Sequence, residues 1–153
     1  MTGFDPAEIA AWLKGPLFAA LSTSAFSVLF GLRSVDVLIA SGGGAVGWMV
    51  FQSMPSQGSV AFASFFAAFM TGIYSEVAGS LRRRPATVYM VASIIPLVPG
   101  SGMYHMMLAT LQGDSIGSVQ VGLTTLMIAF ALAAGLAVAS AIGRMLFPKL
   151  FRE

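Results

Sequence analysis

The chain has 153 residues, of which 57% are hydrophobic and 9% are charged, against roughly 25% charged in a usual soluble domain. Its mean hydropathy is +0.86, its net charge is +2, and it contains no cysteine. A soluble fold needs more charged surface, and disulfides, thiolate metal sites and cysteine nucleophiles are excluded. The composition therefore predicts an all-α integral membrane protein, which we expect to form one membrane domain over residues 1–153.

The apolar segments predict five transmembrane helices, because a membrane span needs about 20 mostly apolar residues in helical form. An interfacial helix over residues 6–14 is expected before the first span, with a break between them at Gly15 and Pro16. Pro55 and Gly58, with two polar residues between them, divide the longest charge-free stretch into two spans. The expected spans cover residues 16–32, 36–54, 59–81, 86–111 and 119–147.

The basic residues support this number of spans. Five spans place one group of Lys and Arg residues on the same side of the membrane, namely Arg33, Arg82, Arg83, Arg84, Arg144, Lys149 and Arg152. Lys14 falls on the other side. Cytoplasmic loops carry an excess of Lys and Arg, so the split predicts a cytoplasmic C-terminus and an N-terminus outside. Because five is odd, two equal inverted halves do not fit, and we expect the chain to oligomerise or to combine with another chain.

Small residues at four-residue spacing predict close helix contacts in the second and fifth spans. Those of the second span are Gly42, Gly43, Gly44 and Gly47. The fifth span has an alanine face made of Ala129, Ala133, Ala137 and Ala141, with Gly135, Ala139 and Gly143 beside it. Helix packing explains both sets, and the glycines of the second span also leave open a substrate that passes close to the backbone.

Glu76 is an acidic residue inside the third span, shortly before the arginines at residues 82–84. Gly72, Gly79 and Ser80 share its helical face, so that face is small and polar and is expected to point into the bundle. A carboxylate at this depth is costly unless it is paired, protonated or hydrated, which makes it a functional candidate. Two interpretations stay open: Glu76 couples transport to protons or contacts a substrate, or it extends to Arg83 or Arg84 and only anchors the helix.

His105 is the single histidine of the chain and lies in the outer half of the fourth span. A metal site would need several more ligands, so we predict neither a metal nor a cofactor. An interior histidine with satisfied hydrogen bonds and a proton-coupling histidine both remain open. Ser101 and His105 lie one turn apart, but no orienting acid is near them, so we expect no enzyme activity.

The strongest local pattern lies in the fourth span, where Pro96 and Pro99 precede Gly100-Ser101-Gly102. A proline lacks an N–H and disfavours helical geometry in the residue before it, so two at this spacing are expected to interrupt the helix. The carbonyls of Ala92 and Ile95 are then expected to lose their donors. Irregular backbone at this depth is tolerated where it is buried in protein or lines a water-filled cavity.

The interrupted helix predicts a binding site for a small carboxylate. The N-terminus of its second half offers free N–H groups and the positive end of a helix dipole to an anion. Tyr89 adds a hydroxyl at about the same depth. The predicted substrate-binding residues are Ser93, Pro96, Pro99, Gly100, Ser101, Gly102 and Tyr104. A kink that serves helix packing alone is the alternative.

The segments RRPATV at residues 83–88 and IPLVPGSGMY at residues 95–104 resemble the threonine/serine exporter family. The resemblance covers roughly residues 15–147 and is closest to the second membrane module of that family, which occurs as a separate small subunit. Pro96, Pro99, Gly100, Gly102 and Tyr104 match its proline–glycine motif. Glu76 and Pro85 are also carried over from the resemblance.

This resemblance implies a subunit of a secondary exporter in the bacterial inner membrane, driven by the proton gradient. Relatives handle threonine and serine, or C4-dicarboxylates such as succinate, and the resemblance implies a larger partner subunit with a cytoplasmic segment. We therefore predict a proton-coupled exporter subunit for small carboxylates of the threonine/serine type. A C4-dicarboxylate exporter subunit and a non-transporting scaffold or assembly subunit are the alternatives. Further copies of the chain are a possible partner, whereas nucleic acid is not expected.

Overall fold

The computed structural model describes residues 6–54 and 59–146, and within these residues the chain is all-helical, as predicted. The described residues form six α-helices and one short 3₁₀ helix. They are α1 (Pro6–Leu29), α2 (Ser34–Ser53), α3 (Val60–Arg82), α4 (Ala86–Ile94), η1 (Ile95–Leu97), α5 (Gly100–Leu111) and α6 (Ser115–Leu146). The turn expected at residues 55–58 lies outside the described residues.

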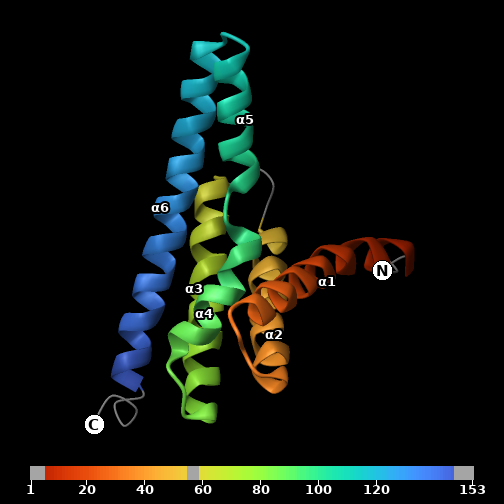
Figure 1. Cartoon of the computed structure of the whole chain (residues 1–153), viewed down its shortest axis with the longest axis vertical. Coiled ribbons are helices and arrows are strands. Elements are labelled where there is room, and N and C mark those ends of the chain that lie inside the picture. Colours follow the sequence, from red (N-terminus) through yellow and green to blue (C-terminus); the bar gives the residue numbers. More distant parts are fainter. Residues whose placement is uncertain (1–5, 55–58, 147–153) are drawn as a thin grey trace, which may run out of the picture.

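The helices form a bundle with a long hairpin at one end (Figure 1). α2, α3 and α4 pack against one another, and α6 packs along α3. The upper half of α6 and the antiparallel α5 extend beyond this bundle, while α1 crosses it and packs on α2 (Figure 1). We call the opposite end of the bundle, where α2 begins, α3 ends and α4 begins, the arginine end, because Arg82, Arg83 and Arg84 lie there.

Three helices of the described chain are long and apolar enough to cross a membrane: Ser34–Ser53, Val60–Arg82 and Ser115–Met145. A fourth span results if Ala86–Leu97 and Gly100–Leu111 are counted together, although they are bent by 47°. α1 does not belong to this set, so the described residues do not confirm the predicted count of five.

The helix boundaries lie close to the expected ones for the second and third spans, and the other spans differ for local reasons. α1 ends at Leu29 because Gly31 adopts a φ of +72° and the Leu32 N–H turns back to the Ser27 carbonyl at 3.0 Å. α6 begins at Ser115, four residues earlier than expected, because the Asp114 carboxylate accepts a hydrogen bond of 2.9 Å from the Gly117 N–H.

The break expected at Gly15 and Pro16 is wrong, because α1 continues through both residues. A proline inside a helix leaves the carbonyl four residues earlier without its donor, and here that carbonyl belongs to Trp12. Gln52 of α2 supplies the missing donor, since its Nε2 lies 2.9 Å from the Trp12 carbonyl oxygen. The interfacial helix of residues 6–14 is therefore not a separate element.

The interruption of the fourth span is confirmed. α4 ends at Ile94, one 3₁₀ turn follows, and α5 begins at Gly100. The expected loss of a donor at Ile95 is wrong, because the Val98 N–H donates to the Ile95 carbonyl at 3.1 Å and so closes the 3₁₀ turn.

Small residues make the helix contacts, as predicted for the second span. Gly43 of α2 lies against Ser93 of α4, whose hydroxyl donates to the Ala40 carbonyl at 2.8 Å, and Gly44 lies against Thr23 of α1. In α6 the packed face differs from the expected one. The alanines at 129, 133, 137 and 141 are exposed, while the glycines beside them pack against α3. A glycine allows the closer approach, because α3 backbone at Phe65 touches the site where Gly135 would carry a Cβ.

Candidate functional site

The helix interruption opens onto a cavity between α5 and α6. This cavity has a volume of about 410 Å³, and we call it the α5–α6 cavity. Its polar lining includes Ser101 of α5 and Gln120, Thr124 and Thr125 of α6, and Pro99 and Gly102 complete the wall on the side of the break. The structure thus brings three of the predicted substrate-binding residues together with three polar side chains of α6.

The backbone at the start of α5 leaves N–H groups available near this cavity. The Gly100 N–H donates to the Val98 carbonyl at 2.8 Å, and the Met103 N–H donates to the Pro99 carbonyl at 3.3 Å. The intervening N–H groups of Ser101 and Gly102 have no backbone partner among the described residues. The first N–H groups of a helix point along its axis with the positive end of the helix dipole, which favours an anion there.

A second cavity, of about 250 Å³, also lies at the break and shares Pro99, Ser101 and Ile128 with the α5–α6 cavity. Trp48 and Phe51 of α2 and Val60 and Ser64 of α3 line it together with residues 96–99. Its lining is mostly apolar, so it offers few groups that could orient a polar ligand. Pro96 belongs to this cavity and not to the α5–α6 cavity.

The other predicted substrate-binding residues lie apart from the α5–α6 cavity. Ser93 is fully buried and its hydroxyl is used in the contact with α2. Tyr104 is 63% exposed, and the space around Gly100 is open, with no atom within 4 Å of an added Cβ. These residues do not form one site with Ser101 and Gly102.

Glu76 and His105, the two residues predicted to couple protons, also lie outside the lining of the α5–α6 cavity. His105 is exposed on α5, where its Nδ1 lies 2.7 Å from the carbonyl oxygen of Ser101 one turn earlier. Glu76 is 7% exposed on α3 and lies at the arginine end of the bundle. Thr71 of α3 lies at the level of the break, since both it and Leu97 approach Gly47. Glu76 is five residues further along α3, which corresponds to about 7.5 Å.

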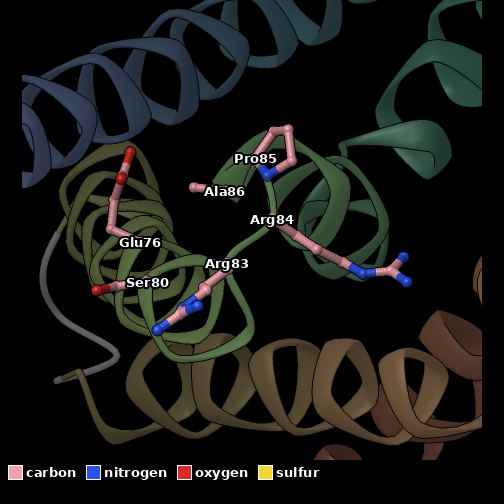
Figure 2. A pocket seen from close by; sticks show the side chains of 7 residues that line it. Glu76, Ser80, Arg83, Arg84, Pro85 and Ala86 are labelled. Atoms are coloured by element: carbon pink, nitrogen blue, oxygen red, sulfur yellow. The ribbon is translucent and has the colours of Figure 1, made fainter. Parts of the chain in front are cut away.

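Glu76 lines a cavity of about 200 Å³, which we call the Glu76 cavity. Its other lining residues are Gly79, Ser80, Arg83, Arg84, Pro85 and Ala86. The Glu76 side chain extends toward α6, where it lies against Gly143 and close to Ser140 and Arg144 (Figure 2). It forms no salt bridge with the arginines of residues 82–84, so the expected alternative of an anchor to Arg83 or Arg84 is not observed.

The arginine end contains a second buried acid, Asp36, whose environment the sequence reasoning missed. Asp36 is fully buried in the first turn of α2. The Tyr89 hydroxyl donates to its Oδ1 at 2.7 Å, the Arg82 Nε lies 3.5 Å from Oδ1, and an Arg84 guanidinium nitrogen lies 3.1 Å from Oδ2. We call these four residues the Asp36 cluster. It joins α2 to the end of α3 and the start of α4.

Two sequence signals could have identified the missed residues. A carboxylate in the first turn of an otherwise apolar span, as at Asp36, needs a partner in the folded protein. Gln120, Thr124 and Thr125 are spaced four and five residues apart, which places polar groups on one face of an apolar helix. Neither signal predicts which helix these polar groups pack against.

The comparison with protein-family models matches the chain over residues 16–142 to the model described as "Threonine/Serine exporter, ThrE". Comparison with curated proteins found no match, and comparison with solved structures also found none. The matched segment runs from α1 into the last turns of α6, so it contains the interrupted helix, the α5–α6 cavity and Glu76. The chain therefore belongs to the threonine/serine exporter family of membrane transporters.

Proposed function

We propose that this chain is the small subunit of a secondary exporter for small carboxylate metabolites of the threonine/serine type. It works in the bacterial inner membrane with a larger subunit that carries a cytoplasmic segment, and the proton gradient drives it. The N-terminus is outside and the C-terminus is cytoplasmic, which follows from the Lys and Arg distribution. In this proposal residues 1–153 form one membrane domain and Glu76 exchanges protons.

The observation that supports this function best is the position of the α5 N-terminus beside polar groups of α6. The free N–H groups of Ser101 and Gly102 suit a substrate carboxylate. Gln120 and Thr124, which line the same cavity, suit the hydroxyl and ammonium groups of a small amino acid. The cavity volume of about 410 Å³ lies within the range of roughly 300–1,000 Å³ that is typical of small-molecule sites.

The test uses inside-out membrane vesicles from cells that express the complete exporter, because export then appears as uptake of radiolabelled threonine. Replacement of both Pro96 and Pro99 with alanine is expected to reduce proton-driven uptake at least about tenfold, since a continuous helix removes the free N–H groups. Pro16→Ala is the matched control, because it removes a proline from the interior of a different helix, α1. Its uptake is expected to stay within about twofold of wild type.

Normal uptake by the double-proline variant, at normal abundance in the membrane, would contradict the proposed role of the interruption. Wild-type vesicles that take up no threonine, even under an imposed proton gradient, would favour the alternative of a scaffold subunit. Uptake of radiolabelled succinate in place of threonine would favour the C4-dicarboxylate alternative.

A further inference from the structure

The Glu76 cavity is lined by an acidic and a basic side chain that form no salt bridge with each other. Glu76 enters it from α3 and is 7% exposed, and Arg83 enters it from the segment that follows α3. Figure 2 shows the two side chains pointing to different sides of the cavity. The guanidinium of Arg84, which also lines the cavity, already has an ion-pair partner in Asp36. Glu76 and Arg83 are thus the charges of this cavity that form no salt bridge among the described residues.

The backbone keeps these two charges apart. Arg83 follows the last residue of α3 and adopts a left-handed φ of 52°, so the chain turns away from the helix axis at this residue. Its side chain is exposed at the mouth of the cavity, whereas Glu76 lies almost two turns deeper on α3. Arg144 of α6 lies near Glu76 but forms no salt bridge with it. A buried carboxylate without a salt bridge is costly, and a ligand cation reduces that cost.

We propose that the Glu76 cavity is a second substrate site, which binds a small zwitterionic amino acid with its ammonium group on Glu76 and its carboxylate on Arg83. The proposal rests on the proposed function, since it makes this cavity the loading site of the same exporter. The Ser80 hydroxyl, which also lines the cavity, is a further hydrogen-bond partner. The cavity holds about 200 Å³, which limits the ligand to a small solute.

The charge arrangement also selects among the substrates that the family handles. A dicarboxylate with one carboxylate on Arg83 would bring its other carboxylate close to the Glu76 carboxylate, and these two negative charges would repel each other. A zwitterion places an opposite charge at both ends of the cavity. The site therefore favours an amino acid over a C4-dicarboxylate.

Binding at Glu76 provides a way to couple export to protons. One carboxylate accepts either a proton or an ammonium group, so substrate and proton exclude each other at this position. The charged groups around Glu76 are Arg144 from α6 and Arg83 and Arg84 from the segment after α3, while α4 contributes the uncharged Ala86. Serine affinity is therefore expected to fall as pH falls, and this pH dependence is expected to disappear in Glu76→Gln.

The experiment measures ligand affinity by calorimetric titration of the intact exporter, purified in detergent through a tag on this chain. Three probes separate the two charges: serine, 3-hydroxypropionate, which lacks the ammonium group, and serinamide, which lacks the carboxylate. The wild-type exporter is expected to bind serine at least about tenfold more tightly than either analogue. In the Pro96→Ala/Pro99→Ala background, which removes the carboxylate site of the α5–α6 cavity, Glu76→Gln is expected to abolish the preference over 3-hydroxypropionate, and Arg83→Gln the preference over serinamide.

Arg33→Gln is the matched control, because Arg33 is an exposed arginine just before α2 that does not line the cavity. It is expected to leave all three affinities unchanged. Since Arg83 is exposed, Arg83→Gln tests the proposal even if Glu76→Gln lowers the yield of folded protein. Unchanged preferences in Arg83→Gln, or in a folded Glu76→Gln variant, of the double-proline background, with normal threonine uptake by wild-type vesicles, overturn this site alone. Wild-type vesicles without threonine uptake overturn the proposed function, and this site with it.

Discussion

The arginine end and the α5–α6 hairpin are built from similar apolar helices, yet they are held together in different ways. At the arginine end, buried side chains bond across elements that are far apart in sequence, as the Tyr89 hydroxyl does with Asp36, 53 residues earlier. α5 has no buried residue, and exposed hydrogen bonds near the connecting turn join it to α6, between Thr110 and Ser118 and from Ser118 to the Met106 carbonyl. His105 and Thr110 also bond to carbonyls one turn earlier in the same helix. Thr124 and Thr125 of α6 do the same.

This difference separates the part of the protein that specifies the fold from the part that carries the candidate carboxylate site. Hydrogen bonds within one helix satisfy side chains but do not position one helix against another. Bonds between helices do, because they require a particular register. Between the break and Met106, no side-chain hydrogen bond joins α5 to α6 among the described residues, and the α5–α6 cavity of about 410 Å³ lies in this stretch. The arginine end, in contrast, closes around the buried Asp36.

The largest expected effect comes from removing the centre of the Asp36 cluster. Asp36→Ala leaves two guanidinium groups and the Tyr89 hydroxyl without their partner, so it is expected to lower the free energy of unfolding by about 2–4 kcal/mol. This is below the roughly 3–5 kcal/mol of a fully buried pair, because water can reach the arginines. Their side chains are 42% and 36% exposed.

Equilibrium unfolding in mixed detergent micelles measures this loss, with Asp114→Ala at the start of α6 as the control. Asp114 is an exposed helix-capping acid in the hairpin, and its loss is expected to cost about 1 kcal/mol. Equal losses in the two variants would mean that the arginine end is held no more tightly than the hairpin.

Glycine-to-alanine substitutions compare the packing of the two regions directly. A Cβ on Gly79 would lie 2.8 Å from the Arg84 carbonyl oxygen and 2.9 Å from the Ala86 Cα, both of which are backbone atoms. Gly79→Ala is therefore expected to destabilise the protein by about 1–3 kcal/mol. Gly100→Ala meets open space and is expected to stabilise by about 0.4–1 kcal/mol. Thermal unfolding midpoints measure both, and a loss of stability in Gly100→Ala would refute the open packing of the hairpin.

The last prediction tests the hydrogen bond that satisfies the Trp12 carbonyl, whose helical donor is missing because of Pro16. Gln52→Leu removes the donor to the Trp12 carbonyl and is expected to cost about 1 kcal/mol. In a Pro16→Ala background the helix regains its own donor, so the same substitution is expected to cost much less. A double-mutant cycle on unfolding free energies measures the difference. Equal costs in both backgrounds would show that Gln52 does not compensate for Pro16.

The membrane class, the approximate extent of α2 and α3, and an interruption at residues 96–102 could be predicted from the sequence. Each of these follows from local chemistry: apolar length for the helices, and missing N–H groups at Pro96 and Pro99 for the interruption. The same local rule failed at Pro16, because the donor that satisfies Trp12 comes from Gln52, 40 residues later. Local rules contain no information about such partners.

The tertiary structure alone decided which polar groups meet. It joined Asp36 to Tyr89 across 53 residues and placed the polar face of α6 beside Ser101. It also directed Glu76 toward α6 and away from the arginines at residues 82–84. In each case the sequence identified a polar group in an apolar helix but not its partner. The partner depends on helix register and crossing, which close contacts at residues such as Gly135 and Gly143 establish.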